Sequence, residues 1–325
     1  MALLLVACAG EPIDATTPSP SAIASSPSVA TTSAPTADWQ VLAPMELWRS
    51  EHSAVVLGGQ ILVFGGLFET SPGNSRVTDT VERYDPVTDI WTSMPSLPEA
   101  RHHGMAAVVN HRVFIIGGYD ATGFNSVDTV WELVGEEWVG RAPLPEPVGA
   151  GAAVVSDGVV YVVGGTPSSG FHAYDPDANT WTTLISPGTQ REHLASAALD
   201  GEVWAIAGRW QGVIYDTTEI YDTATDTWRP GPTLNEARSG FGAAIVEGAL
   251  FVAGGEVFGP NQALVSVERL EPGGPAWELI ESLPIGLHGN PLIAVGTTLY
   301  LPGGSTVAAA VDNDGRLFSL DLGRR

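Results

Sequence analysis

The 325-residue chain has a single cysteine, Cys8, and no lysine; all 14 of its basic residues are arginine, against 37 acidic residues. One cysteine excludes an internal disulfide and a metal site built from several thiolates. The net charge of −23 argues against the cationic surface that nucleic-acid binding requires, and it opposes docking on anionic lipid. No segment after residue 8 is long and apolar enough to span a bilayer. These absences argue against a nucleic-acid partner and against a membrane-spanning segment. The only membrane contact that we expect is a lipid anchor at the N-terminal segment, described next.

The N-terminal segment has two parts. Leu5-Val6-Ala7-Cys8 resembles the processing site of a bacterial lipoprotein, so we expect residues 1–10 to be part of a signal and anchor, with Cys8 lipidated. The basic region and the full apolar stretch of a signal peptide are missing, so either the true start lies further upstream or the match is accidental. Residues 11–37 are almost entirely Pro, Ser, Thr and Ala, a composition that cannot fold. They are predicted to be a disordered linker, either a spacer from a membrane or a tail without a tether.

One motif recurs six times from about residue 39 to residue 322: an apolar run ending in a glycine pair, a Tyr-Asp-type turn, and a tryptophan. Successive glycine pairs are separated by 52, 47, 43, 47 and 49 residues. A period of this size indicates a repeat architecture. The pairs are Gly65-Gly66, Gly117-Gly118, Gly164-Gly165, Ala207-Gly208, Gly254-Gly255 and Gly303-Gly304, and the tryptophans are Trp39, Trp91, Trp138, Trp181, Trp228 and Trp277.

Each repeat carries the signals of four short antiparallel strands. In the second copy, residues 104–109 and 112–118 flank a tight turn at Asn110-His111, which is typical of a hairpin. A third strand and a tryptophan-bearing fourth strand follow, and four strands per repeat predict one blade of a β-propeller. The first strands are rich in small residues, as strands crowded near an axis require. The tryptophans are expected to fill the wedges between blades.

The repeat resembles the kelch family. The matching features are the glycine pairs, the turns Tyr84-Asp85-Pro86, Tyr174-Asp175-Pro176 and Tyr221-Asp222, and the tryptophan six or seven residues later. The departures are Ala207 in the fourth pair, and Glu132-Leu133 and Leu270-Glu271 in place of Tyr-Asp. The resemblance implies an all-β fold for residues 38–325, a six-bladed kelch-type propeller of the galactose oxidase/kelch superfamily.

The ends of the repeat region predict how the ring closes. Residues 38–42 hold a tryptophan strand with no blade before it, whereas the third strand at residues 316–320 is followed by no tryptophan strand. We therefore expect residues 39–42 to complete the sixth blade, three strands from the C-terminal part and one from the N-terminal part. Such closure removes exposed sheet edges.

Candidate binding residues lie at one end of the blades, where the loops enter each first strand and leave each second strand. Arginines recur before the first strands and histidines follow them, so a partial ring at the channel mouth could hold a carboxylate or sulfate. Residues of these types at these places also belong to the general kelch pattern and can brace loops. Arg209 and Trp210 follow the irregular Ala207-Gly208 and add an aromatic surface. The candidate ligand-binding residues are Arg49, Arg101, His103, Arg191, His193, Arg209, Trp210 and Arg238.

The sequence predicts no catalytic residue, cofactor or metal site. Asp312-Asn313-Asp314-Gly315 resembles part of a calcium loop but lacks the later glutamate, so a turn is the better interpretation. The scattered histidines have no ligand spacing and could meet only if the channel brings them together. No nucleophile motif or phosphate-binding glycine loop is present.

Three functions remain open at this point. The main hypothesis is a monomeric binding module, secreted or lipid-anchored outside a bacterial cytoplasm, that recognises a glycan, peptide or protein through the loop face. The alternative is a periplasmic mutarotase-like enzyme for sialic-acid-type sugars, with an arginine on the substrate carboxylate and a nearby acid or histidine for proton transfer. A copper oxidase is disfavoured because that class needs a tyrosine–cysteine cross-link and no cysteine lies in the propeller. A purely structural envelope protein is the third.

Overall fold

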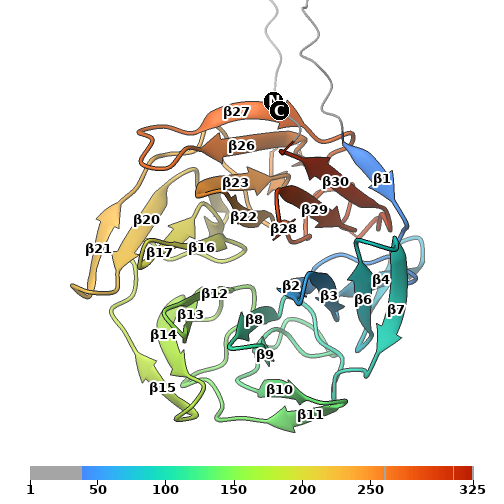
Figure 1. The fold of residues 1–325 in the computed structure, drawn as a ribbon, viewed down its shortest axis with the longest axis horizontal. Coiled ribbons are helices and arrows are strands. Elements are labelled where there is room, and N and C mark those ends of the chain that lie inside the picture. Colours follow the sequence, from blue (N-terminus) through green and yellow to red (C-terminus); the bar gives the residue numbers. More distant parts are fainter. Residues whose placement is uncertain (1–38, 260, 310, 324–325) are drawn as a thin grey trace, which may run out of the picture. The chain divides into compact units, whose positions relative to one another are not determined.

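The computed structural model describes residues 39–259, 261–309 and 311–323, which form six four-stranded antiparallel sheets around a central channel (Figure 1). Cys8 and the predicted linker at residues 11–37 lie outside the described residues. In the part of the chain that is described, no helix is long and apolar enough to cross a membrane. The prediction of an all-β, six-bladed propeller is confirmed.

The six sheets follow one another along the chain, and each is ordered from the channel outward. Blade 1 contains β2 (Ser53–Leu57), β3 (Gln60–Phe64), β6 (Val81–Asp85) and β7 (Ile90–Met94). Blade 2 contains β8 (Met105–Val109), β9 (Arg112–Ile116), β10 (Val130–Val134) and β11 (Glu137–Gly140). Blade 3 contains β12 (Ala152–Ser156), β13 (Val159–Gly164), β14 (Gly170–Asp175) and β15 (Thr180–Thr183).

The second half of the ring repeats this order. Blade 4 contains β16 (Ala195–Leu199), β17 (Glu202–Ile206), β20 (Thr218–Asp222) and β21 (Thr227–Pro230). Blade 5 contains β22 (Gly242–Val246), β23 (Ala249–Ala253), β26 (Ser266–Leu270) and β27 (Glu278–Ser282). Blade 6 contains β28 (Ile293–Val295), β29 (Thr298–Pro302), β30 (Leu317–Asp321) and β1 (Gln40–Leu42). Thus β1, from the start of the described chain, is the outer strand of the last blade and pairs antiparallel with β30.

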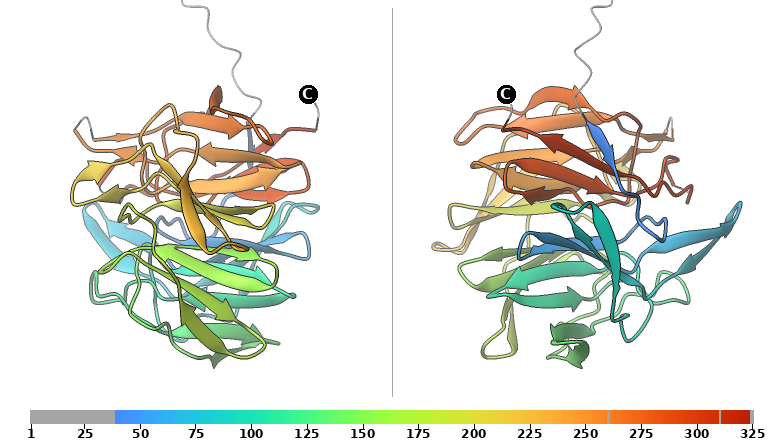
Figure 2. Two further views of the ribbon diagram at one scale, coloured as in Figure 1. Left: turned by 90° about the vertical axis from the view of Figure 1, so that its left-hand side faces the viewer. Right: turned by 45° about the vertical axis from the view of Figure 1, so that its right-hand side comes forward.

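Three blades carry an extra two-stranded ribbon between their second and third main strands. The ribbons are β4 (Leu67–Ser71) with β5 (Asn74–Val77), β18 (Arg209–Trp210) with β19 (Val213–Ile214), and β24 (Glu256–Val257) with β25 (Gln262–Ala263). The β4–β5 hairpin projects from the body of the ring (Figure 2).

The glycine pairs join neighbouring blades. The second residue of every pair donates its backbone N–H to the carbonyl that opens the next blade, at 2.7–3.0 Å, and the last of these bonds, Gly304 to Arg49, closes the ring. The first residue has a positive φ and no room for a side chain: at Gly65, with φ +59°, an added Cβ would lie 2.2 Å from the Arg101 carbonyl oxygen. Only the fourth pair departs, with Ala207 at φ +49°. The pairs are therefore conformational requirements of blade-to-blade contact.

The tryptophans fill the wedges between blades, as predicted. Trp91 is 7% exposed and packs in one core cluster with Tyr300 and Leu317 of blade 6. Five of the six indole N–H groups donate to a carbonyl in the segment that arrives from the preceding blade, at 2.6–3.1 Å. These five rings thus combine apolar packing with a satisfied donor, as buried tryptophans usually do.

Candidate functional site at the channel mouth

Six equivalent residues form a closed ring of backbone hydrogen bonds at one mouth of the channel. Each lies just before the first strand of its blade and has a φ between 49° and 64°. Each backbone N–H donates to the carbonyl of its equivalent in the preceding blade, at 2.5–3.1 Å. We call these residues the mouth ring: Glu51, His103, Ala150, His193, Gly240 and Gly289.

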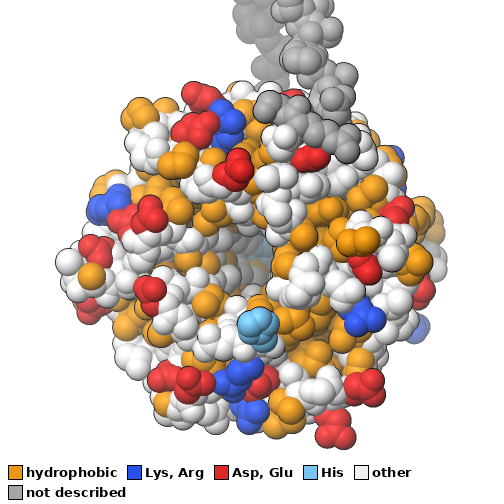
Figure 3. Space-filling view, in the orientation of Figure 1, with side chains coloured by type: hydrophobic (Ala, Val, Ile, Leu, Met, Phe, Trp, Pro, Cys, Tyr) orange, Lys and Arg blue, Asp and Glu red, His pale blue; other side chains and the backbone are white. Residues whose placement is uncertain are grey.

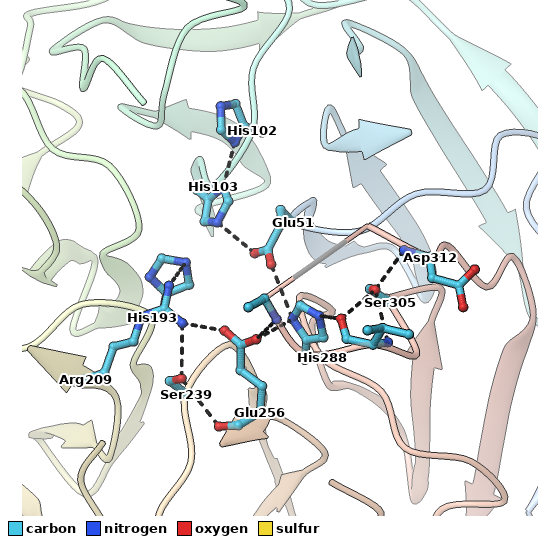
Figure 4. Close-up of polar contacts among 12 residues, drawn as sticks. Glu51, His102, His103, His193, Arg209, Ser239, Glu256, His288, Ser305 and Asp312 are labelled. Carbon is cyan, nitrogen blue, oxygen red and sulfur yellow. Dashed lines mark hydrogen bonds and ion pairs between the residues drawn. The ribbon is translucent and has the colours of Figure 1, made fainter. Parts of the chain in front are cut away.

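The mouth ring holds three ionisable side chains on residues with an uncommon backbone conformation. Glycine adopts a left-handed φ without a steric cost, as Gly240 and Gly289 do here. For residues with a Cβ the same conformation costs roughly 1–2 kcal/mol each. Glu51, His103 and His193 bear this cost, and their side chains converge (Figure 4). Strained residues of this kind are concentrated at functional sites.

Glu51 lies between two histidines (Figure 4). Its Oε2 is 3.0 Å from His103 Nε2, and its Oε1 is 3.5 Å from His288 Nδ1, which is also 3.5 Å from Glu256 Oε2. Burial disfavours the charged form of Glu51. The attraction of the neighbouring histidines and their hydrogen bonds outweigh this effect, so the pKa of Glu51 lies well below its usual value. Burial likewise opposes the charge on His288, but Glu51 and Glu256 raise its pKa. Both shifts favour the charged forms of Glu51 and His288.

His193 belongs to a second set of charges, centred on Arg209. His193 Nδ1 is 2.9 Å from Glu192 Oε2, and its Nε2 is 3.1 Å from Arg209 Nη2. Arg209 also donates through Nε to Glu192 Oε1 at 2.8 Å and through Nη1 to Glu256. Burial lowers the pKa of His193, which favours the neutral ring. Burial would raise the pKa of Glu192, but hydrogen bonds from His193 and Arg209 lower it to about 2.

The four other predicted arginines are buried and none of them lines the cavity at the mouth, so the expectation of an arginine ring is corrected. Arg49, Arg101, Arg191 and Arg238 are at most 2% exposed. Arg238, for example, donates to the Gly254 carbonyl at 2.7 Å and to Glu268 at 2.7 Å. Arg49 and Arg191 make the same contacts with the first residue of their glycine pair and with a third-strand glutamate. The guanidinium groups of these three arginines brace the glycine turn against its own blade. Arg101 instead donates to Glu99 and to the Thr129 hydroxyl.

Of the remaining predicted residues, His103, His193 and Arg209 meet at the mouth, whereas Trp210 does not. Trp210 is half-buried in the β18–β19 ribbon, opposite Val213. We call the charged residues in contact at the mouth the cluster: Glu51, His103, Glu192, His193, Arg209, Glu256 and His288. Sequence reasoning missed Glu192 and Glu256 as members of it. The repeat register could have found Glu256, because it follows its glycine pair directly, as Arg209 does one blade earlier.

Two cavities are lined by Glu51, His103 and His193, and a groove adjoins one of them. The channel itself encloses about 230 Å³ between the first strands, and Figure 3 shows a hollow at the centre of the ring. A cavity of about 250 Å³ lies over the mouth ring and is lined by His193, Arg209, Phe124 and Val311, among others. A groove of about 620 Å³ continues from it over blades 1, 2 and 6, and shares Leu67, Phe124 and Val311 with it.

Comparison with known proteins agrees with this architecture. Residues 51–255 match the family described as KLHDC2/KLHL20/DRC7 Kelch-repeats domain, and residues 237–284 match the Kelch motif. Since the first match covers more than half of the chain, the protein belongs to the kelch-repeat family. Kelch propellers generally bind proteins.

Its curated relatives are longer proteins. The chain is 25% identical over 270 residues to Kelch-like protein terF of Aspergillus terreus, covering 80% of this chain and 50% of that protein. It is 26% identical over 258 residues to human Kelch-like protein 23, covering 79% and 37%, respectively. With alpha-scruin of Limulus polyphemus it shares 26% identity over 286 residues, 80% of this chain and 31% of the relative. The chain therefore spans half or less of the length of these relatives.

Proposed function

We propose that this propeller is a protein-binding module that holds an extended peptide segment of its partner in the groove over blades 1, 2 and 6. Phe124 carries the proposal: its side chain is 70% exposed at the point where the groove meets the mouth cavity. Its ring lies edge-on to Tyr119 and His102, with centroids 5.2 and 5.3 Å away. An exposed aromatic ring held by other rings is the kind of anchor that dominates peptide and protein interfaces.

The charge of the groove indicates which peptides it prefers. Of the twelve arginines that the structure describes, ten contact a carboxylate and Arg83 donates to the Thr92 hydroxyl. Arg76, at the groove wall, has no side-chain partner among the described residues. A guanidinium without a local acid is available for a carboxylate of the partner. The expected ligand is a peptide with an acidic residue close to an apolar one.

A peptide-display selection followed by calorimetry tests this proposal. Phe124→Ala and Arg76→Ala should each weaken binding of the selected peptides about tenfold or more. Arg83→Ala is the matched control, because Arg83 lies in the same blade but not in the groove, and it should leave the affinity unchanged. Binding that is insensitive to both groove variants, or a response to sugars and not to peptides, would refute the proposal.

The mutarotase alternative is not proposed. It required an exposed arginine for the substrate carboxylate, and Arg49, Arg101, Arg191 and Arg238 are buried. The comparisons also offer no support for it.

We further propose that the module is displayed outside the cytoplasm on a lipid attached to Cys8. The support is the small-residue sequence before Cys8 and the Pro/Ser/Thr/Ala-rich residues 11–37, which suit a spacer. Metabolic labelling with a radioactive fatty acid should mark the protein and fail to mark Cys8→Ser. Equal labelling of both proteins, or of neither, would contradict a lipid anchor at this residue.

A further inference from the structure

The mouth ring brings together three side chains of the types that bind a transition-metal ion. Glu51, His103 and His193 each offer a ligand atom, and these atoms all lie within 4.8 Å of one another. They come from blades 1, 2 and 4, so no spacing along the sequence reveals them. All three occupy mouth-ring positions, where the backbone is held by hydrogen bonds on both sides. The geometry is therefore set by the ring and not by flexible loops.

Neighbouring groups determine which ring nitrogen of each histidine faces the others. His193 Nδ1 is 2.9 Å from Glu192 Oε2, which accepts its proton, so the lone pair of His193 lies on Nε2, where Arg209 now contacts it. His102 Nε2 is 2.9 Å from the Gly123 carbonyl and must donate there, so His102 Nδ1, 2.7 Å from His103 Nδ1, is an acceptor. His103 then donates through Nδ1 and presents an Nε2 lone pair. Histidine ligands usually have their second nitrogen held in this way.

In the same chain of contacts, no proton is left for the contact between His103 and Glu51. Two neutral imidazoles carry two protons, and both are used between Gly123, His102 and His103. The third contact, 3.0 Å between His103 Nε2 and Glu51 Oε2, then has a lone pair on each side. Either an additional proton or another cation must lie there. A metal ion fits the chemistry because it takes a lone pair from both atoms.

We propose that Glu51, His103 and His193 bind one divalent transition-metal ion of the Zn²⁺ class at the channel mouth. Two imidazoles and one carboxylate form a three-ligand set known for Zn²⁺ sites that keep a fourth position open. Here the fourth position faces the cavity of about 250 Å³, which all three residues line. The inference is independent of the proposed peptide groove.

Binding requires one local rearrangement. Arg209 Nη2 lies 3.1 Å from His193 Nε2, so this contact must break when the ion binds. Arg209 keeps its other partners in that event, because Nε contacts Glu192 and Nη1 contacts Glu256. The three glutamates of the cluster, Glu51, Glu192 and Glu256, supply the negative charge that a divalent ion needs beside an arginine.

Calorimetric titration of the chelator-treated full chain with ZnCl₂ tests the site. Cys8→Ser serves as the parent protein, because that thiol is itself a potential ligand. We expect one ion per chain, a higher melting temperature with Zn²⁺, and visible absorption of a four-coordinate site when Co²⁺ replaces Zn²⁺. His103→Ala and His193→Ala should each weaken Zn²⁺ binding by about 100-fold or more, whereas Glu192→Gln, which alters only an outer contact, should weaken it about 10–100-fold.

Two features of the chain keep the test decisive. Ala150 occupies the equivalent position in blade 3, so alanine is compatible with the mouth-ring backbone and the variants should fold. His172→Asn is the matched control: His172 is another buried histidine beside a glutamate, 3.2 Å from Glu146, but it is not in the cluster. It should bind Zn²⁺ as the parent does. Absence of one-to-one binding, or binding that survives in the folded His103→Ala/His193→Ala protein, would overturn the proposal.

Discussion

Replacing Arg238 by methionine should destabilise the propeller far more than the same change at Arg229. Both arginines contact a glutamate at almost the same distance, 2.7 Å to Glu268 and 2.6 Å to Glu202. The first pair is completely buried, whereas the Arg229 side chain is 52% exposed. Removing one partner of a buried pair costs about 3–5 kcal/mol, because the other charge stays buried without it. An exposed pair contributes about 0–1 kcal/mol.

The structure also shows what else Arg238 loses. Its guanidinium donates to the carbonyls of Gly254 and Ser266 at 2.7 and 3.2 Å and to the Ser266 hydroxyl at 3.0 Å. Glu268 keeps hydrogen bonds from Asn235, so some compensation remains and the lower part of the range is expected for the free energy. At about 2–4 °C per kcal/mol, the melting temperature should fall by roughly 6–15 °C.

Thermal and urea unfolding of Arg238→Met and Arg229→Met measure this difference. The double variant Arg238→Met/Glu268→Met should be less destabilised than the sum of its two single changes, by about 0.5–3 kcal/mol, because the two side chains interact directly. Equal losses of stability for Arg238→Met and Arg229→Met would refute the reasoning that burial of the pair, and not its contact distance, sets the cost.

Three further predictions concern the ring and its charges. Gly65→Ala should lower the free energy of unfolding by about 1–3 kcal/mol more than Gly58→Ala, as measured by chemical denaturation. Both residues have a φ of +59°, but only at Gly65 would the new Cβ meet a carbonyl. Equal losses would contradict this reasoning. The pKa of Glu132 is lowered mainly by its hydrogen bond from Arg112, so its contribution to stability is present above its unfolded value and is lost as the pH falls through its folded value. Glu132→Gln should therefore be less stable at pH 7 and show a weaker loss of stability below about pH 4.5, as pH-dependent melting would reveal; an unchanged slope would contradict the assignment. Deleting residues 1–43, which removes β1 from blade 6, should lower the melting temperature, and an unchanged value would exclude a stabilising role for this strand.

The fold was predictable because each repeat contains the residues that its blade requires. A glycine pair is needed wherever the backbone takes a positive φ against the neighbouring blade, as at Gly65, and a tryptophan is needed wherever a wedge must be filled, as at Trp91. Six copies of these requirements leave a period that is visible in the sequence. The departures at Ala207 and Glu132 did not hide it.

The site was only partly predictable. Arg49 and Arg238 precede their first strands, as the pattern indicated, but a position before a strand does not show whether the side chain turns toward the channel or back under the glycine turn. Both side chains turn back under the glycine turn, because there their guanidinium groups donate to buried carbonyls and, for Arg238, to a buried glutamate. Glu256 was missed because its significance depends on Arg209, which belongs to the previous blade.

The sequence by itself determined the number of blades, the register of their strands and the family, since these depend on local requirements that repeat along the chain. Only the tertiary structure decided the site. Closing six blades into a ring places Glu51, His103 and His193 side by side through backbone hydrogen bonds between residues of different blades. Contacts of that kind arise from the curvature of the whole ring, and no single repeat contains the information that specifies them.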